Sequence, residues 1–179
     1  MRFKEIKLKG AYVIELELLK DDRGFFARSF CREEFKKHDL NFQVAQCNVS
    51  YNIKRGTLRG MHYQAAPHEE VKLIRCAKGV IYDVIIDLRP DSPTFKQWIS
   101  IELVADNYTM LYVPKGFAHG FQTLLDDTEV FYQMSELYYP ESAGGVRWDD
   151  PAFGITWPIS QPILSPKDCS YPFFKLKTE

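Results

Sequence analysis

Hydrophobic and polar positions alternate with a period of two along most of this chain. Within 80–88 (VIYDVIIDL), every even-numbered residue is apolar or aromatic, and the odd-numbered residues alternate isoleucine with aspartate. Such alternation predicts a β-strand. The same pattern predicts further strands at 11–19, 42–51, 71–77, 97–103, 109–114, 118–125 and 129–134.

Turn-forming residues separate these segments, as in KDDRG (20–24), RPDSPT (89–94) and PKG (114–116). Only 31–39 (CREEFKKHD) reads as a helix, and it is short. Many short strands with turns between them predict an all-β sandwich or barrel. The periodicity fades after Trp148, where the chain becomes rich in proline. We expect one domain over 1–179, with the segment 149–179 docked on it as loops and short helical turns.

Composition narrows the class of protein. The chain has 179 residues and a net charge of −1, so we expect no nucleic-acid partner, which would need a basic surface. No apolar run approaches the roughly 20 residues of a membrane span, and the charged N-terminus does not resemble a signal peptide. The four cysteines form no CxxC pair and fit no zinc spacing, which favours free thiols in the cytoplasm.

The stretch RGTLRGMHYQ (55–64) carries more polar chemistry than a core strand should. Arg59 and His62 lie three residues apart, so strict alternation would place them on opposite faces. Gly60 lies between them, and a glycine inside a strand often marks a bulge. A bulge would let both side chains point into one cavity. The alternative is a solvated edge strand with an isolated histidine.

Other predicted strands also carry single polar side chains among apolar neighbours: Lys72, Asp83, His119 and Tyr132. A buried carboxylate such as that of Asp83 is costly unless it is paired. A barrel whose strands each contribute one polar group to an aromatic interior is typical of a ligand pocket.

A catalytic metal is the alternative use of such a pocket, because β-barrels often hold iron, manganese or zinc on clustered histidines. The histidines here are His38, His62, His68 and His119, and no HxH pair occurs. His62 and His68 are six residues apart, and Ala65, Ala66 and Pro67 between them suit a loop better than a strand that carries metal ligands. The spacing therefore disfavours a metal.

The motifs together resemble those of the dTDP-4-dehydrorhamnose 3,5-epimerase family. They include DDRGFFARSF (21–30), RGTLRGMHYQ (55–64), VKLIRCAKGVIYDVIIDLR (71–89), VPKGFAHGFQ (113–122) and LSPKD (164–168), in the family's order. The resemblance implies a cupin-type jelly roll with a few short helices, which forms a homodimer by strand exchange. It also implies that the substrate is a nucleotide-linked 4-keto-6-deoxyhexose. The implied reaction converts dTDP-4-dehydro-6-deoxy-D-glucose to dTDP-4-dehydro-L-rhamnose and uses no metal or organic cofactor.

The resemblance also implies catalytic roles. A ketone at C4 acidifies the hydrogens at C3 and C5, so the reaction needs a base, an acid on the opposite face and a cation at the ketone oxygen. His62 matches the base, and Asp168 matches the carboxylate that orients it. Lys72 is placed to stabilise the enolate oxygen, and Tyr132 matches the acid. Asp83 is expected as a second carboxylate that fixes His62 or Lys72.

The remaining family positions imply substrate binding. Arg23, Arg59, His119 and Lys167 match contacts to the diphosphate. Gln46 and Asn48 match a polar pair that lines the sugar or nucleotide, and Phe26 and Tyr138 are expected to flank the base or the sugar.

Two positions depart from the family pattern. Arg28 replaces a usual glutamate in DDRGFFARSF, and we expect it to contact the substrate and relax the preference for thymidine. Ala143 stands where an acidic residue is usual, with Glu141 near enough to substitute.

Two readings from other classes remain. A non-catalytic cupin that binds a sugar nucleotide is disfavoured, because binding alone needs neither a His–Asp pair nor an opposed tyrosine. A single-position epimerase or a 3,4-ketoisomerase would use the same base and acid, so the sequence does not separate these from a 3,5-epimerase.

Overall fold

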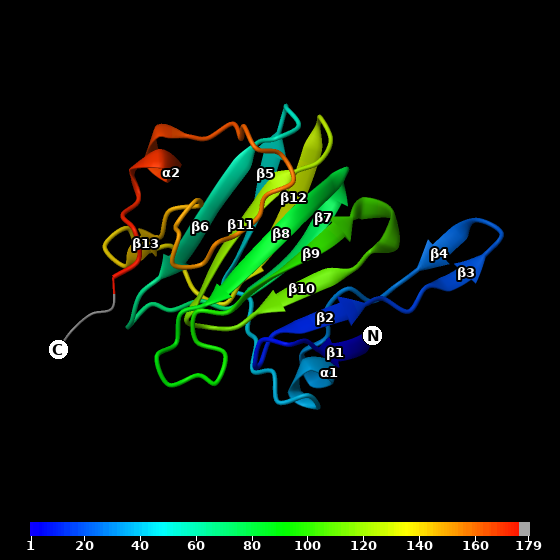
Figure 1. Cartoon of the computed structure of the whole chain (residues 1–179). Coiled ribbons are helices and arrows are strands. Elements are labelled where there is room, and N and C mark those ends of the chain that lie inside the picture. Colours follow the sequence, from blue (N-terminus) through cyan, green and yellow to red (C-terminus); the bar gives the residue numbers. More distant parts are fainter. Residues whose placement is uncertain (176–179) are drawn as a thin grey trace.

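Two antiparallel sheets face each other in the computed structural model, which describes residues 1–175 (Figure 1). The six-stranded sheet has the order β1 (Arg2–Glu5), β2 (Tyr12–Glu15), β10 (Met110–Val113), β7 (Lys72–Lys78), β12 (Thr128–Met134) and β5 (Gln46–Asn52). The five-stranded sheet has the order β13 (Ala143–Gly145), β6 (Leu58–Gln64), β11 (Phe117–Thr123), β8 (Val80–Asp87) and β9 (Trp98–Val104). The predicted jelly-roll fold is confirmed.

The alternation along β8 follows from burial on both of its faces. Ile81 and Ile85 are fully buried in the core between the two sheets. Val84 and Ile86 are fully buried on the other side of the strand, in a second cluster. A strand covered on both faces is apolar at both parities, which explains why only aspartates interrupt it.

The C-terminal segment supplies the cover on that second face. Phe153 and Val146 pack with Val84 and Ile86, and Trp157 packs against the same cluster. The indole of Trp157 donates a hydrogen bond to the carbonyl of Trp148 at 2.9 Å. The segment then forms α2 (Pro166–Ser170), which contacts β6. The segment thereby brings α2 to the edge of the five-stranded sheet (Figure 1).

A two-stranded hairpin extends from the body of the molecule (Figure 1). Its strands are β3 (Leu19–Asp21) and β4 (Gly24–Phe26), joined by the turn at residues 22–23. The sequence predicts the turn but neither short strand on its two sides, because three residues are too few to show alternation. Phe26 is 71% exposed, which is unusual for a phenylalanine that has no partner to cover it.

The helices are few and short, as predicted. Helix α1 (Arg32–Lys36) lies within the predicted 31–39, and Phe35 buries its ring in a cluster on the six-stranded sheet. A 3₁₀ turn, η1 (Ala105–Asn107), follows β9. Across residues 1–175, no helix is long and apolar enough to cross a membrane.

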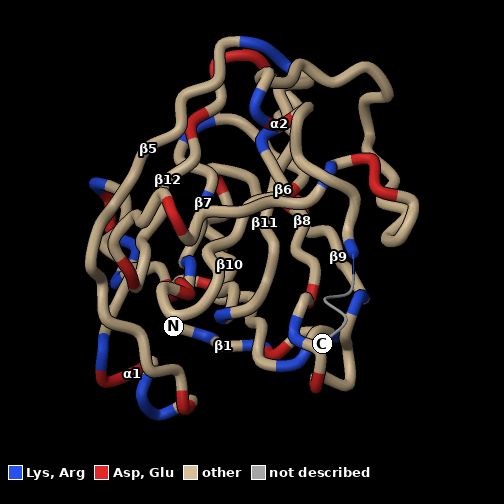
Figure 2. Tube along the Cα trace, turned by 90° about the vertical axis from the view of Figure 1, so that its left-hand side faces the viewer, with Lys and Arg blue, Asp and Glu red and all other residues tan. Residues whose placement is uncertain are grey.

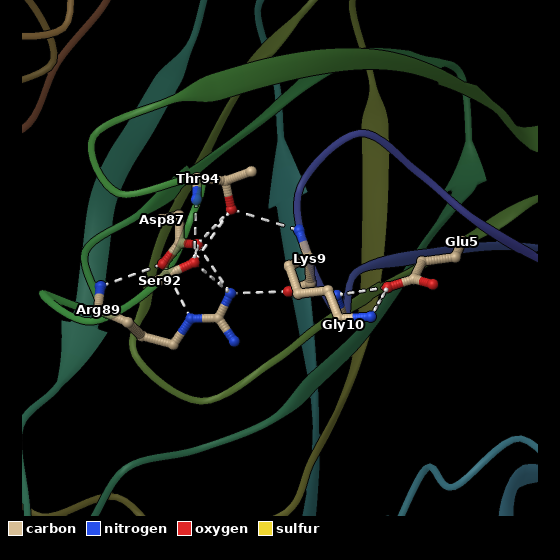
Figure 3. A network of polar contacts seen from close by, with 7 residues as sticks. All are labelled: Glu5, Lys9, Gly10, Asp87, Arg89, Ser92 and Thr94. Carbon is tan, nitrogen blue, oxygen red and sulfur yellow. Dashed lines mark hydrogen bonds and ion pairs between the residues drawn. The ribbon is translucent and has the colours of Figure 1, made fainter.

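Residues of both charge signs are interspersed along the chain (Figure 2). A network of polar contacts centres on the fully buried carboxylate of Asp87 (Figure 3). Its carboxylate accepts hydrogen bonds from Arg89, Ser92 and Thr94. Arg89 also donates to the carbonyl of Lys9 at 2.7 Å. The network therefore ties the loop after β8 to the turn between β1 and β2.

Candidate active site

A cavity of about 390 Å³ lies between the two sheets and is closed on one side by the segment that contains α2. The six-stranded sheet contributes side chains from β5, β7 and β12, and the five-stranded sheet contributes them from β6 and β11. Most of the predicted site residues line this cavity: Gln46, Asn48, Arg59, His62, Lys72, His119, Tyr132, Tyr138, Lys167 and Asp168.

A bulge in β6 brings Arg59 and His62 to the same cavity, as predicted. His119 pairs with His62 and Phe121 pairs with Arg59, so three steps along β6 match two along β11. Gly60 occupies the irregular position with a φ of +148°, a region that side-chain-bearing residues rarely adopt. A Cβ at Gly60 would lie 2.6 Å from the Cα of Gly120. Close backbone approach therefore requires glycine here.

His62 and Asp168 form a hydrogen-bonded pair at the cavity wall, and Ser165 holds the carboxylate from its other side. The Nε2 atom of His62 lies 2.5 Å from Oδ1 of Asp168, and Ser165 Oγ donates to Oδ2 at 2.7 Å. Burial would raise the pKa of Asp168, but the hydrogen bonds from His62 and Ser165 outweigh it and lower the pKa. An ionised carboxylate only accepts, so Nε2 carries the hydrogen and Nδ1 carries the lone pair. The half-exposed imidazole is thus prepared to accept a proton.

Tyr132 and Lys72 reach the cavity from the opposite sheet, on β12 and β7. Burial raises the pKa of Tyr132 well above its ordinary value, and the nearby charge of Asp83 adds to the effect. The phenol therefore keeps its proton across the neutral range. Lys72 Nζ donates to the backbone carbonyl of His62 at 3.1 Å, which links the two sheets. The cavity accordingly has a proton acceptor on one wall and a proton donor on the other.

The predicted partner of Asp83 is wrong. Its Oδ1 lies 2.5 Å from Nε2 of His119, and it contacts neither His62 nor Lys72 by hydrogen bond or ion pair. The reason is sheet order: β8 pairs with β11, so Asp83 lies behind His119 and away from β6. Asp83 is fully buried, and burial raises its pKa. Its Oδ2 has no hydrogen-bond partner among residues 1–175.

Three predicted binding residues do not line the cavity of their own chain: Arg23, Phe26 and Arg28. Arg23 pairs with Asp21 inside the hairpin at 2.6 Å. Arg28 pairs with Glu34 of α1 at 3.0 Å. Of the two positions near the other departure, Ala143 lines the cavity, whereas Glu141 is exposed and does not. Glu141 therefore does not replace the missing acidic group.

Sequence reasoning missed several residues that line this cavity, and three of them lie beside its predicted catalytic groups: Glu70, Ser165 and Tyr171. The ring of Tyr171 meets the His62 ring edge-on, with 5.5 Å between centroids. Ser165 and Tyr171 flank the KD pair of LSPKD, and Glu70 lies two positions before Lys72. Proximity in sequence to predicted residues was the only available signal, because all three lie outside regular strands.

Comparison with known proteins agrees with this geometry. Residues 5–175 match the family model described as dTDP-4-dehydrorhamnose 3,5-epimerase. A curated enzyme of that name from Sinorhizobium fredii is 40% identical over 173 residues, covering 96% of this chain and 89% of the relative. A crystal structure of the Bacillus anthracis enzyme with TDP and PPi bound is 45% identical, with a TM-score of 0.94, and covers 97% of this chain and 99% of that one.

A structure with a different specificity is also similar. The 3'-monoepimerase from Streptomyces bikiniensis, in complex with dTDP-quinovose, is 35% identical with a TM-score of 0.87. It covers 94% of this chain and 85% of that one. The family match spans nearly the whole chain, and the relatives share both its fold and much of its sequence. This chain belongs to the dTDP-4-dehydrorhamnose 3,5-epimerase family and is an epimerase.

Proposed function

We propose that this protein is a cytoplasmic, cofactor-independent homodimer that inverts C3 and C5 of dTDP-4-dehydro-6-deoxy-D-glucose to give dTDP-4-dehydro-L-rhamnose. His62 removes the proton next to the ketone, and Asp168 stabilises the imidazolium that forms. Lys72 stabilises the negative charge that develops on the ketone oxygen. Tyr132 returns a proton from the opposite face, which inverts the carbon.

The rest of the cavity anchors the nucleotide. Arg59 and Lys167 supply positive charge for the diphosphate, and arginine can grip phosphate oxygens with two parallel N–H groups. Asn52 Oδ1 accepts from Nε of Arg59 at 2.7 Å and so orients the guanidinium. His119, Gln46 and Asn48 supply polar contacts to the sugar nucleotide, and the ring of Tyr138 flanks it. Apart from Asn52, all of these side chains line the same cavity as His62 and Tyr132.

One observation carries this proposal: His62, which is paired with Asp168 of α2, and Tyr132 come from facing sheets and line one cavity. The test is incubation with dTDP-4-dehydro-6-deoxy-D-glucose in deuterated water, followed by NMR. We expect deuterium at C3 and at C5 and formation of the L-rhamno product. The His62→Ala variant should abolish exchange at both carbons while substrate binding persists. Exchange in this variant near the wild-type rate would refute the role of His62.

Single-position epimerisation is the second candidate, because one similar structure is that of a 3'-monoepimerase. The same NMR experiment separates the two. Deuterium and inversion confined to C3 would favour the second candidate. The residues alone do not decide, since the base and the acid are common to both reactions.

We propose that the β3–β4 hairpin completes the site of a partner subunit. Phe26 and Arg23 lie on a projecting, exposed element, and neither lines the cavity of its own chain. A dimer that places this hairpin over the partner's cavity would bring them to the nucleotide. Arg28 follows the hairpin, and we propose that it relaxes the preference for thymidine. Comparing turnover of thymidine-, cytidine- and guanosine-linked sugars by wild type and Arg28→Glu tests this role.

A further inference from the structure

Glu70 is a nearly buried carboxylate on the wall of the catalytic cavity. Its side chain is 10% exposed, and its Oε1 lies 2.9 Å from Nζ of Lys72, whose side chain is 7% exposed. Both residues line the cavity. In the proposed function, this cavity binds a substrate with a negatively charged diphosphate. A second negative charge on the cavity wall does not help to bind such a substrate, so the carboxylate of Glu70 calls for another role.

The position of Glu70 is fixed by its neighbours. Val71 N donates to Ser135 Oγ at 2.7 Å, and Ser135 N donates to the carbonyl of Val71 at 3.0 Å. Upstream, the side chain of Gln64 donates to the carbonyl of His68 at 2.9 Å. The backbone on both sides of Glu70 is therefore anchored, and its carboxylate is presented to Lys72 from a constrained loop.

Lys72 is consequently held at two points. The hydrogen bond from Nζ to the carbonyl of His62 and the ion pair with Glu70 restrict an ammonium that would otherwise rotate on a flexible stem. An ammonium has three N–H donors, so donor capacity remains for one oxygen of a ligand.

We infer that Glu70 is a positioning residue, which aims the ammonium of Lys72 at the ketone oxygen of the substrate. This inference rests on the proposed function, because it assumes the enolate role of Lys72. Glu70 acts through Lys72 and transfers no proton itself. Its effect therefore falls on the chemical step and not on binding of the nucleotide.

Variants at this position separate geometry from charge. Glu70→Gln keeps an oxygen acceptor at the same reach without the charge, whereas Glu70→Asp keeps the charge on a shorter stem. Glu70→Ala removes both. Glu69→Gln is the matched control, because Glu69 is the adjacent glutamate and lines a different cavity. The measurements are kcat, KM and the midpoint of thermal unfolding for each variant.

For a positioning role, we expect kcat to fall about tenfold in Glu70→Ala, which is about 1.4 kcal/mol. KM should change less than about twofold, and Glu70→Gln should retain more activity than Glu70→Asp. Adding Glu70→Ala to Lys72→Met should cost nothing further, because the two residues act as one unit. The Glu69→Gln control should match wild type.

Three results would overturn the inference: wild-type kcat in Glu70→Ala, better activity in Glu70→Asp than in Glu70→Gln, or a rise in KM alone. The Asp and Gln variants keep the test decisive if the alanine variant does not fold. Wild-type protein in the same assay distinguishes a failure of the role of Glu70 from a failure of the proposed function. If wild type itself does not turn over the substrate, then the proposed function fails, whatever Glu70 does.

Discussion

At the scale of single residues, two imidazole–carboxylate pairs lie on neighbouring strands but differ in their surroundings. His62 and His119 are cross-strand neighbours, and each contacts an aspartate at 2.5 Å. Asp168 has Ser165 as a second partner and a lowered pKa. Oδ2 of Asp83 has no partner within the part of the chain that the structure describes, and burial raises the pKa of Asp83. Only the Asp168 pair thus keeps its negative charge firmly available to stabilise a protonated imidazole. The environment, more than the residue types, distinguishes the proposed base from its neighbour.

The raised pKa of Tyr132 leads to a prediction about its proton. Tyr132→Phe removes the donor on the wall opposite His62, while the base can still remove and return a proton on its own side. We expect deuterium to enter from solvent with less than about a tenth of the wild-type inversion rate, since general acids contribute 10²–10⁴-fold. NMR of the product in deuterated water measures both quantities.

Tyr112→Phe is the control for this experiment. Tyr112 is also buried, with its pKa raised to about 12, but it does not line the cavity. Its variant should exchange and invert like wild type. Normal inversion by Tyr132→Phe would mean that another group supplies the proton.

At the scale of elements, alternation predicts strands but not which strand lies beside which. The strand 80–88 and the placement of Ile81 and Asp83 on one face were predicted correctly. The partner of Asp83 was not predicted correctly, because it depends on the pairing of β8 with β11. Contacts between residues far apart in the sequence determine that pairing. Loop residues such as Glu70 carry no periodic signal at all. The bulge at Gly60 was predictable because a glycine inside a strand is itself the signal.

That bulge makes Gly60 a strongly constrained position of β6. Gly60→Ala would place a Cβ against the backbone of Gly120 and would force an unfavourable φ on alanine. We expect a loss of at least about 2 kcal/mol in the free energy of unfolding, as for other overpacked, strained sites. Turnover should fall by more than the loss of folded protein explains, because Arg59 and His62 flank the bulge. Urea unfolding and turnover measure the two effects.

Gly24→Ala separates strain from steric conflict. Gly24 also has a positive φ, +134°, but a Cβ there would meet nothing within 4 Å. Its variant should lose less stability than Gly60→Ala. Equal losses for both variants would show that close approach to Gly120 is unimportant.

The buried network of β8 predicts a pH dependence of stability. Burial would raise the pKa of Asp87, but hydrogen bonds from Arg89, Ser92 and Thr94 lower it below the unfolded value of about 3.9. Its contribution is therefore fully present above pH 4 and is lost as the pH falls through the folded-state pKa. We expect Asp87→Asn to cost about 2 kcal/mol at pH 7, as for a lost charged hydrogen bond.

The difference between Asp87→Asn and wild type should shrink below about pH 4. Urea unfolding at pH 7 and at pH 3 gives both values. Asp91→Asn, an exposed aspartate in the same loop, should be neutral at either pH. A cost of Asp87→Asn that stays constant with pH would show that the carboxylate's charge is not what stabilises the loop.

At the scale of the whole molecule, the cavity of one chain contains the proposed proton-transfer groups but not all predicted binding residues. The two sheets and α2 enclose His62, Lys72 and Tyr132. The hairpin that carries Arg23 and Phe26 projects away from the body, on the side opposite α2 in the view of Figure 1. Exposed aromatic residues on a projecting ribbon are typical of a surface that a partner covers. A site shared between two subunits would reconcile the residue pattern with the position of the hairpin.

Mixing two inactive variants tests this sharing directly. One protomer carries His62→Ala with an intact hairpin, and the other carries Arg23→Ala and Phe26→Ala with an intact base. If each hairpin serves the partner's cavity, every mixed dimer holds one complete site, formed by the intact base of one protomer and the intact hairpin of the other. Random exchange of equal amounts makes half of the dimers mixed, with one of two sites active, so we expect about a quarter of wild-type turnover. If each hairpin serves its own chain, no mixed dimer contains a complete site, and activity should not exceed the sum of the separate variants.

The variants are unfolded and refolded together to exchange subunits, and each variant refolded alone is the control. Recovery to about a quarter supports a shared site, whereas no recovery in a sample shown by size and mass to contain mixed dimers refutes it.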